Sequence, residues 1–221
     1  MTQSKYSTRQ LTLMAMFAAI AYVAMLVTRP LPQIAGFLSY DLKDVVIAVA
    51  GFLLGPAPAL AIAAVVSLIE MVTVSGTGPI GLLMNVLSTS AFALPPAMYY
   101  ARNKSLRAAG TGLALGVAAM TAVMLAWNYI VTPLYMGVPR EVVASMLLPT
   151  FLPFNLFKGG LNAGITMLIY KPVVGTLRRI GMVEAPHAGH APHRFNWTAT
   201  LLSAFVIVTS VVVLWLMSRP S

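Results

Sequence analysis

The chain has 221 residues, of which 59% are hydrophobic and only 9% are charged, and it carries a net charge of +9 at pH 7. This composition excludes a water-soluble globular protein, because so few polar residues cannot cover a domain of this size, and it indicates an integral membrane protein. The lack of cysteine excludes disulfides and thiolate chemistry, and the scattering of basic residues over the expected loops argues against a nucleic-acid-binding face.

Apolar runs recur along almost the whole chain and predict an all-α integral membrane protein, since a helical span needs about 20 mostly apolar residues. In chain order, the predicted spans are residues 11–27, 45–54, 57–74, 79–100, 111–131, 155–170 and 197–217. The second span is short, and the sequence Gly55-Pro56-Ala57-Pro58 breaks the helical pattern after it. Because proline lacks an amide hydrogen and clashes with the preceding turn, the second and third spans should form a tight hairpin.

The segment before the last span differs from the rest of the chain. Residues 181–196 are rich in proline, alanine, glycine and histidine, which predicts a flexible cytoplasmic linker. His187, His190 and His193 recur at every third position, but the intervening prolines and glycine preclude a regular helix that would hold the three imidazoles together. We therefore expect no metal site here.

The distribution of lysine and arginine predicts a multi-pass protein of the cell membrane with a cytoplasmic N-terminus, because basic residues favour the inner side. This orientation places the basic clusters at residues 5–9, 102–107 and 171–179 inside. Two long connections, residues 28–44 and 132–154, then lie outside. The second contains PREVVASMLL, which predicts a short amphipathic helix between Pro139 and Pro149 that could cover a site from outside.

Polar residues collect at the outer ends of four predicted spans. They are Glu70, Asn85, Asn128, Asn155 and Lys158, with Asn162 one turn deeper. Asn155, Lys158 and Asn162 follow the spacing i, i+3, i+7, which places them on one face of a helix. Because a lysine that faces lipid is costly, we expect this face to line an outward-facing pocket. The alternative is that Lys158 snorkels to the interface while the asparagines only join helices.

The residue types around this pocket suit a planar, largely uncharged metabolite. Neutral amides predominate, and Lys158 is the cation, with Glu70 as its candidate counter-charge. Gly159 and Gly160 leave room for another backbone or a flat ligand. Amides pair with the edge of a heteroaromatic ring, while aromatic side chains pack on its faces. The nearby aromatic residues are Phe37, Tyr40, Trp127, Tyr129, Phe154 and Phe157.

The sequence contains no arrangement typical of an enzyme, so we expect no catalytic residue and no cofactor. No G-x-x-x-x-G-K-[ST] loop is present, and no histidine lies in any predicted span to activate a serine. GTGPIG, at residues 76–81, formally matches a dinucleotide-binding fingerprint but lacks the preceding strand, and we interpret it as a turn between two spans. Energy from ATP hydrolysis would therefore have to come from a partner.

Four segments together resemble a known transporter family. They are GFLSYDLKDVVIAVAGFLLGP at 36–56, SLIEMVTVSGTGPIGLLMNVLS at 67–88, WNY at 127–129 and PFNLFKGG at 153–160. This combination is similar to the riboflavin-specific S components (the RibU family) of energy-coupling factor (ECF) transporters, over about residues 11–179. The resemblance implies a six-helix S-component domain at residues 1–180. Residues 197–217 then form an extra transmembrane helix outside the family pattern.

The resemblance also implies the function of particular residues. Asn128, Asn155 and Lys158 match positions that contact the flavin, and Leu38, Ser39, Tyr40 and Asp41 match the first outer loop, which closes over it. Ala15 and Ala19 match the small-residue motif that docks on the transmembrane coupling subunit. The implied partners are riboflavin, membrane lipid, that coupling subunit and two ATPase subunits. The S component topples in the membrane to release the vitamin inside.

Two other functions stay open from the sequence alone. The first is an S component for a different vitamin, which would keep the scaffold and the Ala15 and Ala19 face. The second is a self-sufficient secondary transporter, although such proteins typically have inverted repeats and binding groups near the membrane midplane, and neither feature is visible here. Glu70, Asn85 and Asn162 have no assigned role.

Overall fold

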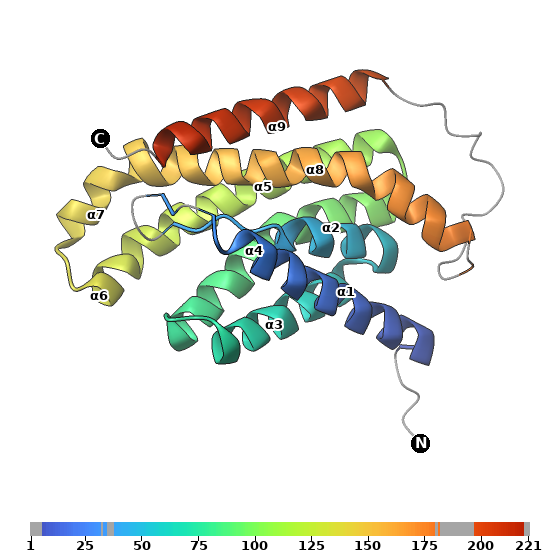
Figure 1. The fold of residues 1–221 in the computed structure, drawn as a ribbon, viewed down its shortest axis with the longest axis horizontal. Helices are drawn as coiled ribbons and strands as arrows, with labels where there is room; N and C mark the ends of the chain where they lie inside the picture. The colour runs from blue at the N-terminus through green and yellow to red at the C-terminus, as the bar shows by residue number, and fades with distance from the viewer. Residues whose placement is uncertain (1–5, 32, 35–37, 180, 182–196, 219–221) are drawn as a thin grey trace.

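The computed structural model describes residues 6–31, 33–34, 38–179, 181 and 197–218, and the regular elements within these ranges are helices (Figure 1). In chain order they are α1 (Thr8–Thr28), α2 (Lys43–Leu54), α3 (Pro56–Thr73), α4 (Gly78–Arg102), α5 (Leu106–Ile130), α6 (Thr132–Met136), α7 (Arg140–Met146), a π-helical turn (Leu147–Phe151), α8 (Leu152–Arg179) and α9 (Trp197–Met217). The all-α prediction is confirmed. The predicted linker, apart from residue 181, lies outside the described residues.

Within the described residues, six helical segments are long and apolar enough to cross a membrane. They are α1, α3, α4, α5, the continuous segment Arg140–Leu177, which includes most of α8, and α9. They coincide with six of the seven predicted spans. The short helix predicted between Pro139 and Pro149 is present as α7 and the π-helical turn.

Helix α2 is the exception among the predicted spans. It has 12 residues, so it extends for about 18 Å, whereas the hydrocarbon core of a bilayer is about 30 Å thick. It packs against α1, α3, α4 and α8, and its middle residues, such as Ile47 and Ala48, are fully buried. A helix that is apolar on all sides belongs in the interior of a bundle. The short second span that we predicted is therefore present as a short central helix of the bundle.

The hairpin between α2 and α3 forms as the sequence predicts. Gly55 has a φ of 95°, in the left-handed region that glycine adopts most readily, and Pro56 begins α3. The chain therefore reverses within one residue, and α3 returns beside α2.

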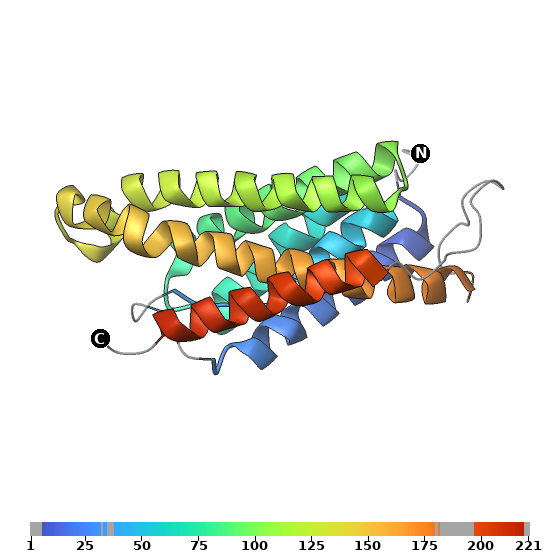
Figure 2. The same cartoon turned by 90° about the horizontal axis from the view of Figure 1, so that it is seen from above.

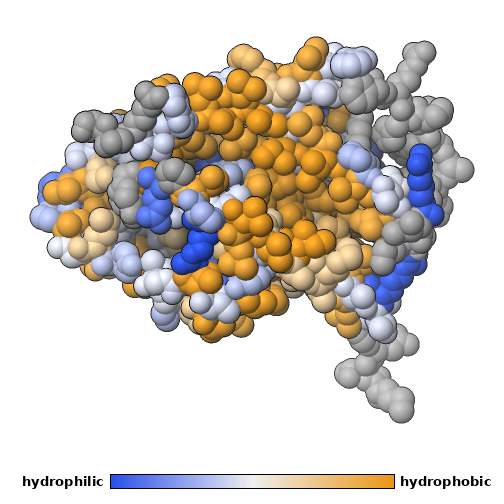
Figure 3. Space-filling model, in the orientation of Figure 1, coloured by the Kyte–Doolittle hydropathy of each residue, from blue (hydrophilic) through white to orange (hydrophobic). Residues whose placement is uncertain are grey.

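The bundle has two distinct ends (Figures 1 and 2). The connection between α1 and α2, the turn between α3 and α4, the short helices α6 and α7, and the C-terminus of α9 lie at one end, which we call the pocket end. The N-terminus of α1 and the turn between α4 and α5 lie at the other end. Figure 3 shows that the visible face is apolar over its middle and has polar patches toward both ends, as expected of a protein that crosses a bilayer.

Glycine allows α4 and α5 to approach closely. A Cβ atom added to Gly116 would lie 2.2 Å from the carbonyl oxygen of Phe92, and one added to Gly112 would lie 2.5 Å from Cα of Pro96. Gly112 and Gly116 are four residues apart, so they face the same side of α5. Close backbone contact of this kind is a main source of helix association in membranes, where lipid tails are as apolar as leucine.

We expect the substitution Gly116→Ala to destabilise the protein by about 1–3 kcal/mol, because the added methyl group meets a backbone oxygen that cannot move aside. Gly110→Ala is the matched control, since the nearest atom to its added Cβ would be Cε of Met167 at 3.9 Å. The control should be neutral or stabilising by about 0.5–1 kcal/mol, because alanine favours the helix. Thermal unfolding in detergent measures both changes, and equal stability of the two variants would contradict the α4–α5 contact.

Candidate binding site

A cavity of about 570 Å³ lies at the pocket end of the bundle. Its size falls within the range of about 300–1,000 Å³ that is usual for small-molecule sites. The lining comes from α1, the α1–α2 connection, α3, the α3–α4 turn, α4, α5, α6 and α8, and α9 contributes none of the described lining residues. The polar lining residues are Arg29, Gln33, Ser39, Tyr40, Asp41, Glu70, Ser75, Thr77, Asn85, Ser88, Asn128, Thr132, Tyr135, Asn155 and Lys158.

The structure brings the residues that we predicted for substrate binding to the wall of this one cavity. They are Leu38, Ser39, Tyr40, Asp41, Asn128, Asn155 and Lys158. Their contact with a ligand stays a prediction. Of the three residues without an assigned role, Glu70 and Asn85 also line the cavity, whereas Asn162 lies behind its wall and is fully buried.

Asn128 and Asn155 lie at the pocket ends of α5 and α8. The amide nitrogen of Asn128 donates to the carbonyl oxygen of Met124 at 2.7 Å, and that of Asn155 donates to the carbonyl oxygen of Phe151 at 2.8 Å. The hydroxyl of Thr132 donates to Oδ1 of Asn128 at 2.9 Å. These bonds fix the orientation of both side chains. Each amide nitrogen still has a second N–H, because an NH₂ group carries two donors.

Lys158 is paired with the α1–α2 connection. Its Nζ atom donates to Oδ2 of Asp41 at 3.3 Å, and it also lies 6.0 Å from the ring centroid of Phe154. The expectation that Glu70 supplies the counter-charge was wrong. Glu70 forms its ion pair with a different lysine. The α1–α2 connection places Asp41 next to α8, where Asp41 pairs with Lys158.

That other lysine is Lys43, the first residue of α2. Its Nζ atom donates to Oε2 of Glu70 at 2.6 Å and lies 3.9 Å from Oδ2 of Asp41. The side chain is only 3% exposed, so the ammonium group depends on these carboxylates for its stabilisation. The sequence analysis placed Lys43 in an outer loop and missed this ion pair. The available signal was a charged residue directly before an apolar run too short to span a membrane.

Asp44, the next residue, is also buried and faces α4. The hydroxyl of Thr89 donates to its Oδ1 atom at 2.6 Å, and the first turn of a helix favours a negative charge. Together, Asp41, Lys43, Asp44, Glu70 and Lys158 form a cluster of two cations and three carboxyl groups, of which Asp41, Glu70 and Lys158 line the cavity. We call this group the charged cluster.

Asn162 holds the α1–α2 connection on α8. The hydroxyl of Tyr40 donates to its Oδ1 atom at 2.9 Å, and its amide nitrogen donates to the carbonyl oxygen of Asp41 at 3.5 Å. Asn162 therefore anchors a segment that supplies part of the cavity wall, and it does not itself line the cavity.

The surroundings of this connection set the charge of two residues in it. Burial disfavours the charged form of Asp41, but the ammonium groups of Lys158 and Lys43 outweigh this effect and hold the pKa of the carboxyl below its usual range. Burial and the neighbouring Asp41 carboxylate raise the pKa of Tyr40 well above its usual value. Asp41 is thus an anion at neutral pH, and Tyr40 is a neutral donor.

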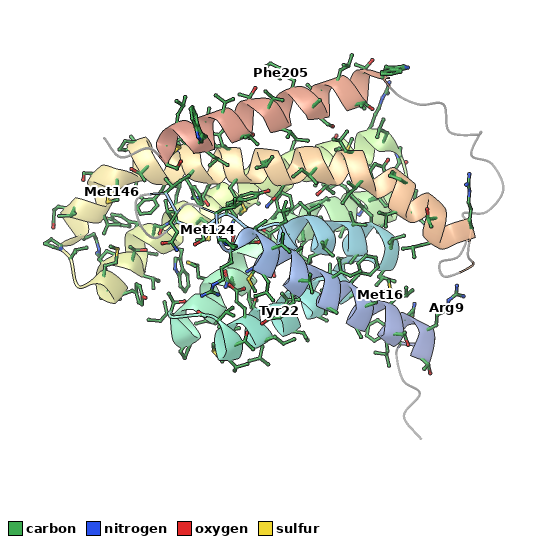
Figure 4. All side chains as sticks on the ribbon, viewed as in Figure 1. Arg9, Met16, Tyr22, Met124, Met146 and Phe205 are labelled. Carbon is green, nitrogen blue, oxygen red and sulfur yellow. The ribbon has the colours of Figure 1, made fainter. Side chains whose placement is uncertain are left out.

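The apolar part of the wall is rich in flexible and flat side chains. Tyr40, Trp127 and Phe154 line the cavity as we expected, together with Met25, Met84 and Met124. Tyr129 and Phe157 are not among the lining residues, and Phe37 lies outside the described residues. Figure 4 shows that Met124 lies among the helices.

The two glycines after Lys158 serve helix packing. A Cβ atom added to Gly159 would lie 3.0 Å from Val117 and Met120 of α5, and one added to Gly160 would lie 3.2 Å from Ser210 of α9. Among the described residues, both glycines therefore face a neighbouring helix, which is one of the two possibilities that the sequence left open. Neither glycine lines the cavity.

Ala15 and Ala19 lie away from the cavity, on the surface of α1. Both are exposed, whereas Leu13, Phe17 and Ala21 on the other side of the helix are buried. The alanine pair therefore belongs to an open apolar face, together with the exposed Ile20 and Val23. A docking role for this face stays a prediction.

Known proteins are similar to this chain along most of its length. The family described as "ECF transporter, substrate-specific component" matches residues 9–170. The riboflavin transporter FmnP of Bacillus subtilis is 27% identical over 73% of this chain and 90% of its own length. The riboflavin transporter RibU of Staphylococcus aureus is 28% identical over 78% of this chain and 94% of its own length.

A solved structure agrees with these matches. It is described as the structure and mechanism of the S component of a bacterial ECF transporter, and it covers 77% of this chain and 98% of its own, with a TM-score of 0.66 and 28% identity. The matched family consists of transporter components and not of enzymes. The chain therefore belongs to the family of substrate-specific (S) components of ECF transporters.

Proposed function

We propose that this chain captures riboflavin in the cavity at the pocket end of the bundle. The observation that carries this proposal is the meeting of Asn128, Asn155 and Lys158, from two different helices, on one cavity wall. The names of the two relatives described above support the choice of vitamin. The cavity is large enough for one tricyclic ring system with a short polar chain.

The chemistry of the lining suits a flavin. The pyrimidine edge of the ring system presents two carbonyl groups with an N–H group between them. The carbonyl groups can accept from the second N–H of each asparagine and from the ammonium group of Lys158, and the N–H group can donate to an asparagine amide oxygen. Trp127, Phe154 and the methionines offer flat and adaptable apolar surfaces for the ring faces. The hydroxyl-bearing side chain of riboflavin would then lie among the polar groups of the remaining wall.

Transport would depend on other subunits. The proposed orientation places the N-terminus in the cytoplasm and the pocket end outside, since the basic clusters at residues 5–9 and 102–107 then lie inside. The exposed Ala15 and Ala19 face would dock on the membrane-embedded coupling subunit, which carries two ATPase subunits. Toppling of the S component against this partner would release riboflavin inside.

Purification of the full chain tests the proposed substrate directly. We expect the protein to retain a yellow flavin, or to quench the fluorescence of added riboflavin in a saturable manner. Mass spectrometry of the released ligand separates riboflavin from another vitamin. Uptake that persists in cells lacking the ATPase subunits would instead favour a secondary transporter.

We expect Lys158→Met to weaken riboflavin binding by roughly tenfold to a hundredfold, because a hydrogen bond to a charged group contributes about 1.5–3 kcal/mol. Fluorescence titration measures the affinity, and the thermal midpoint of the ligand-free protein shows whether the fold survives. Lys104→Met is the matched control, since Lys104 is exposed at the opposite end of the bundle. Unchanged affinity in Lys158→Met would remove this lysine from the site.

We expect Ala15→Leu and Ala19→Leu to abolish uptake while leaving riboflavin binding unchanged, since a larger side chain prevents close approach of a partner helix. Uptake in cells and binding to purified protein are measured separately. Ala114→Leu, at an exposed position of α5, is the matched control and should transport normally. Loss of binding in the two α1 variants would mean that these alanines support the fold and not docking.

A further inference from the structure

Helix α9 lies beyond residues 9–170, which match the family, and it packs along α8 through a narrow seam (Figures 1 and 2). A Cβ atom added to Gly164 would lie 2.8 Å from Ile207 and 3.2 Å from the carbonyl oxygen of Ser203. Ser203, Ser210 and Leu214 are the buried residues of α9. Its other sides are exposed and apolar, and Figure 4 shows Phe205 pointing away from the bundle.

The C-terminal end of this seam reaches the α1–α2 connection, which supplies part of the cavity wall. Leu214 forms a buried apolar cluster with Ile34 of the α1–α2 connection and with Phe154 and Leu161 of α8. We call this the brace cluster. Partly buried residues packed against it are Leu38, Tyr40, Phe157, Ile165, Ile207 and Met217. Two of these, Ile207 and Met217, also come from α9.

The brace cluster and the residues packed against it share members with the cavity wall. Phe154 belongs to both, and Leu38 and Tyr40, which pack against the brace cluster, also line the cavity. Ile34 is tied to Leu38 by two backbone hydrogen bonds, each 2.9 Å long, so a displacement of Ile34 also displaces Leu38. Leu161 precedes Asn162, which accepts the hydrogen bond from Tyr40. The apolar and polar contacts of the connection therefore lie side by side on α8.

We propose that α9 is a brace that holds the α1–α2 connection over the cavity and slows its opening, with Leu214 as the positioning residue. Leu214 does not line the cavity. Its effect on the cavity must therefore pass through the other residues of the brace cluster, in the connection and in α8. Loss of its side chain would leave a gap in the buried cluster that contains Ile34 and would raise the population in which the connection is lifted. The effect on bound riboflavin rests on the proposed function, whereas the effect on the connection does not.

Hydrogen exchange of the full chain in lipid nanodiscs tests the brace without any ligand. Local opening exposes the hydrogen-bonded amides of Ile34 and Leu38, and we expect Leu214→Ala to increase their exchange rates by on the order of tenfold. Leu216→Ala is the matched control, because Leu216 lies on the same helix but is 53% exposed. The control should exchange as the unmodified protein does. Equal rates in Leu214→Ala and Leu216→Ala overturn the proposal.

A second variant displaces α9 without substituting any residue of the brace cluster. Gly164→Leu places a side chain where Ile207 and the Ser203 carbonyl lie, so it should push α9 off α8 and speed exchange at the same two amides. The amides of α5 serve as the internal reference for a global loss of fold. Faster exchange at Ile34 and Leu38 with an unchanged α5 supports the brace, and unchanged exchange at both amides contradicts it.

The rate of riboflavin dissociation tests whether the brace affects the binding site. We expect Leu214→Ala to release riboflavin on the order of tenfold faster than Leu216→Ala, since release requires the connection to lift. If neither variant nor the unmodified chain binds riboflavin while exchange still increases in Leu214→Ala, the proposed substrate fails and the brace stands. If riboflavin binds and its release and the exchange rates are the same in both variants, the brace fails and the substrate stands.

Discussion

The buried ammonium group of Lys43 is the constraint on which the pocket end of this bundle depends. An uncompensated cation in an apolar interior is strongly destabilising, so carboxylates must reach it. Glu70 does so from α3 at 2.6 Å, and Asp41 approaches from the α1–α2 connection at 3.9 Å. Since Asp41 also pairs with Lys158 at 3.3 Å, the charged cluster joins α2, α3 and α8 through one loop residue. The short length of α2 is what places Lys43 at this depth.

This charged cluster explains why the α1–α2 connection lies against the cavity and lines part of it. Asp41 can satisfy Lys43 and Lys158 together only if the connection folds back over the bundle. Asn162 and the brace cluster then hold the neighbouring residues, Tyr40 through a hydrogen bond and Ile34 through apolar contacts. The connection is therefore fixed by charge, hydrogen bonding and packing at three adjacent places. Lifting it requires the three kinds of contact to loosen together.

The sequence predicts the helices well because each is an apolar run bounded by charged or helix-breaking residues. The spacing of Asn155, Lys158 and Asn162 likewise predicts a shared face of α8. Sequence could not predict which carboxylate meets which lysine, since Asp41 and Lys158 are 117 positions apart and only the tertiary fold joins them. It also could not separate Asn155, which lines the cavity, from Asn162, which anchors the loop. The two glycine pairs, Gly112 with Gly116 and Gly160 with Gly164, are small residues four apart, a spacing that indicates close helix contact but not which helix approaches.

The two glycine pairs show that α4 and α5 pack more closely than α8 and α9. The α4–α5 pair brings backbone against backbone, with added Cβ atoms at 2.2 and 2.5 Å from main-chain atoms of α4. The α8–α9 pair meets mainly side chains, at 2.8 and 3.2 Å, with one carbonyl oxygen at 3.2 Å. Every described residue of the cavity wall lies between Met25 and Lys158, within the part of the chain that matches the family. The cavity is thus complete without α9, and α9 can influence it only through the α1–α2 connection and α8.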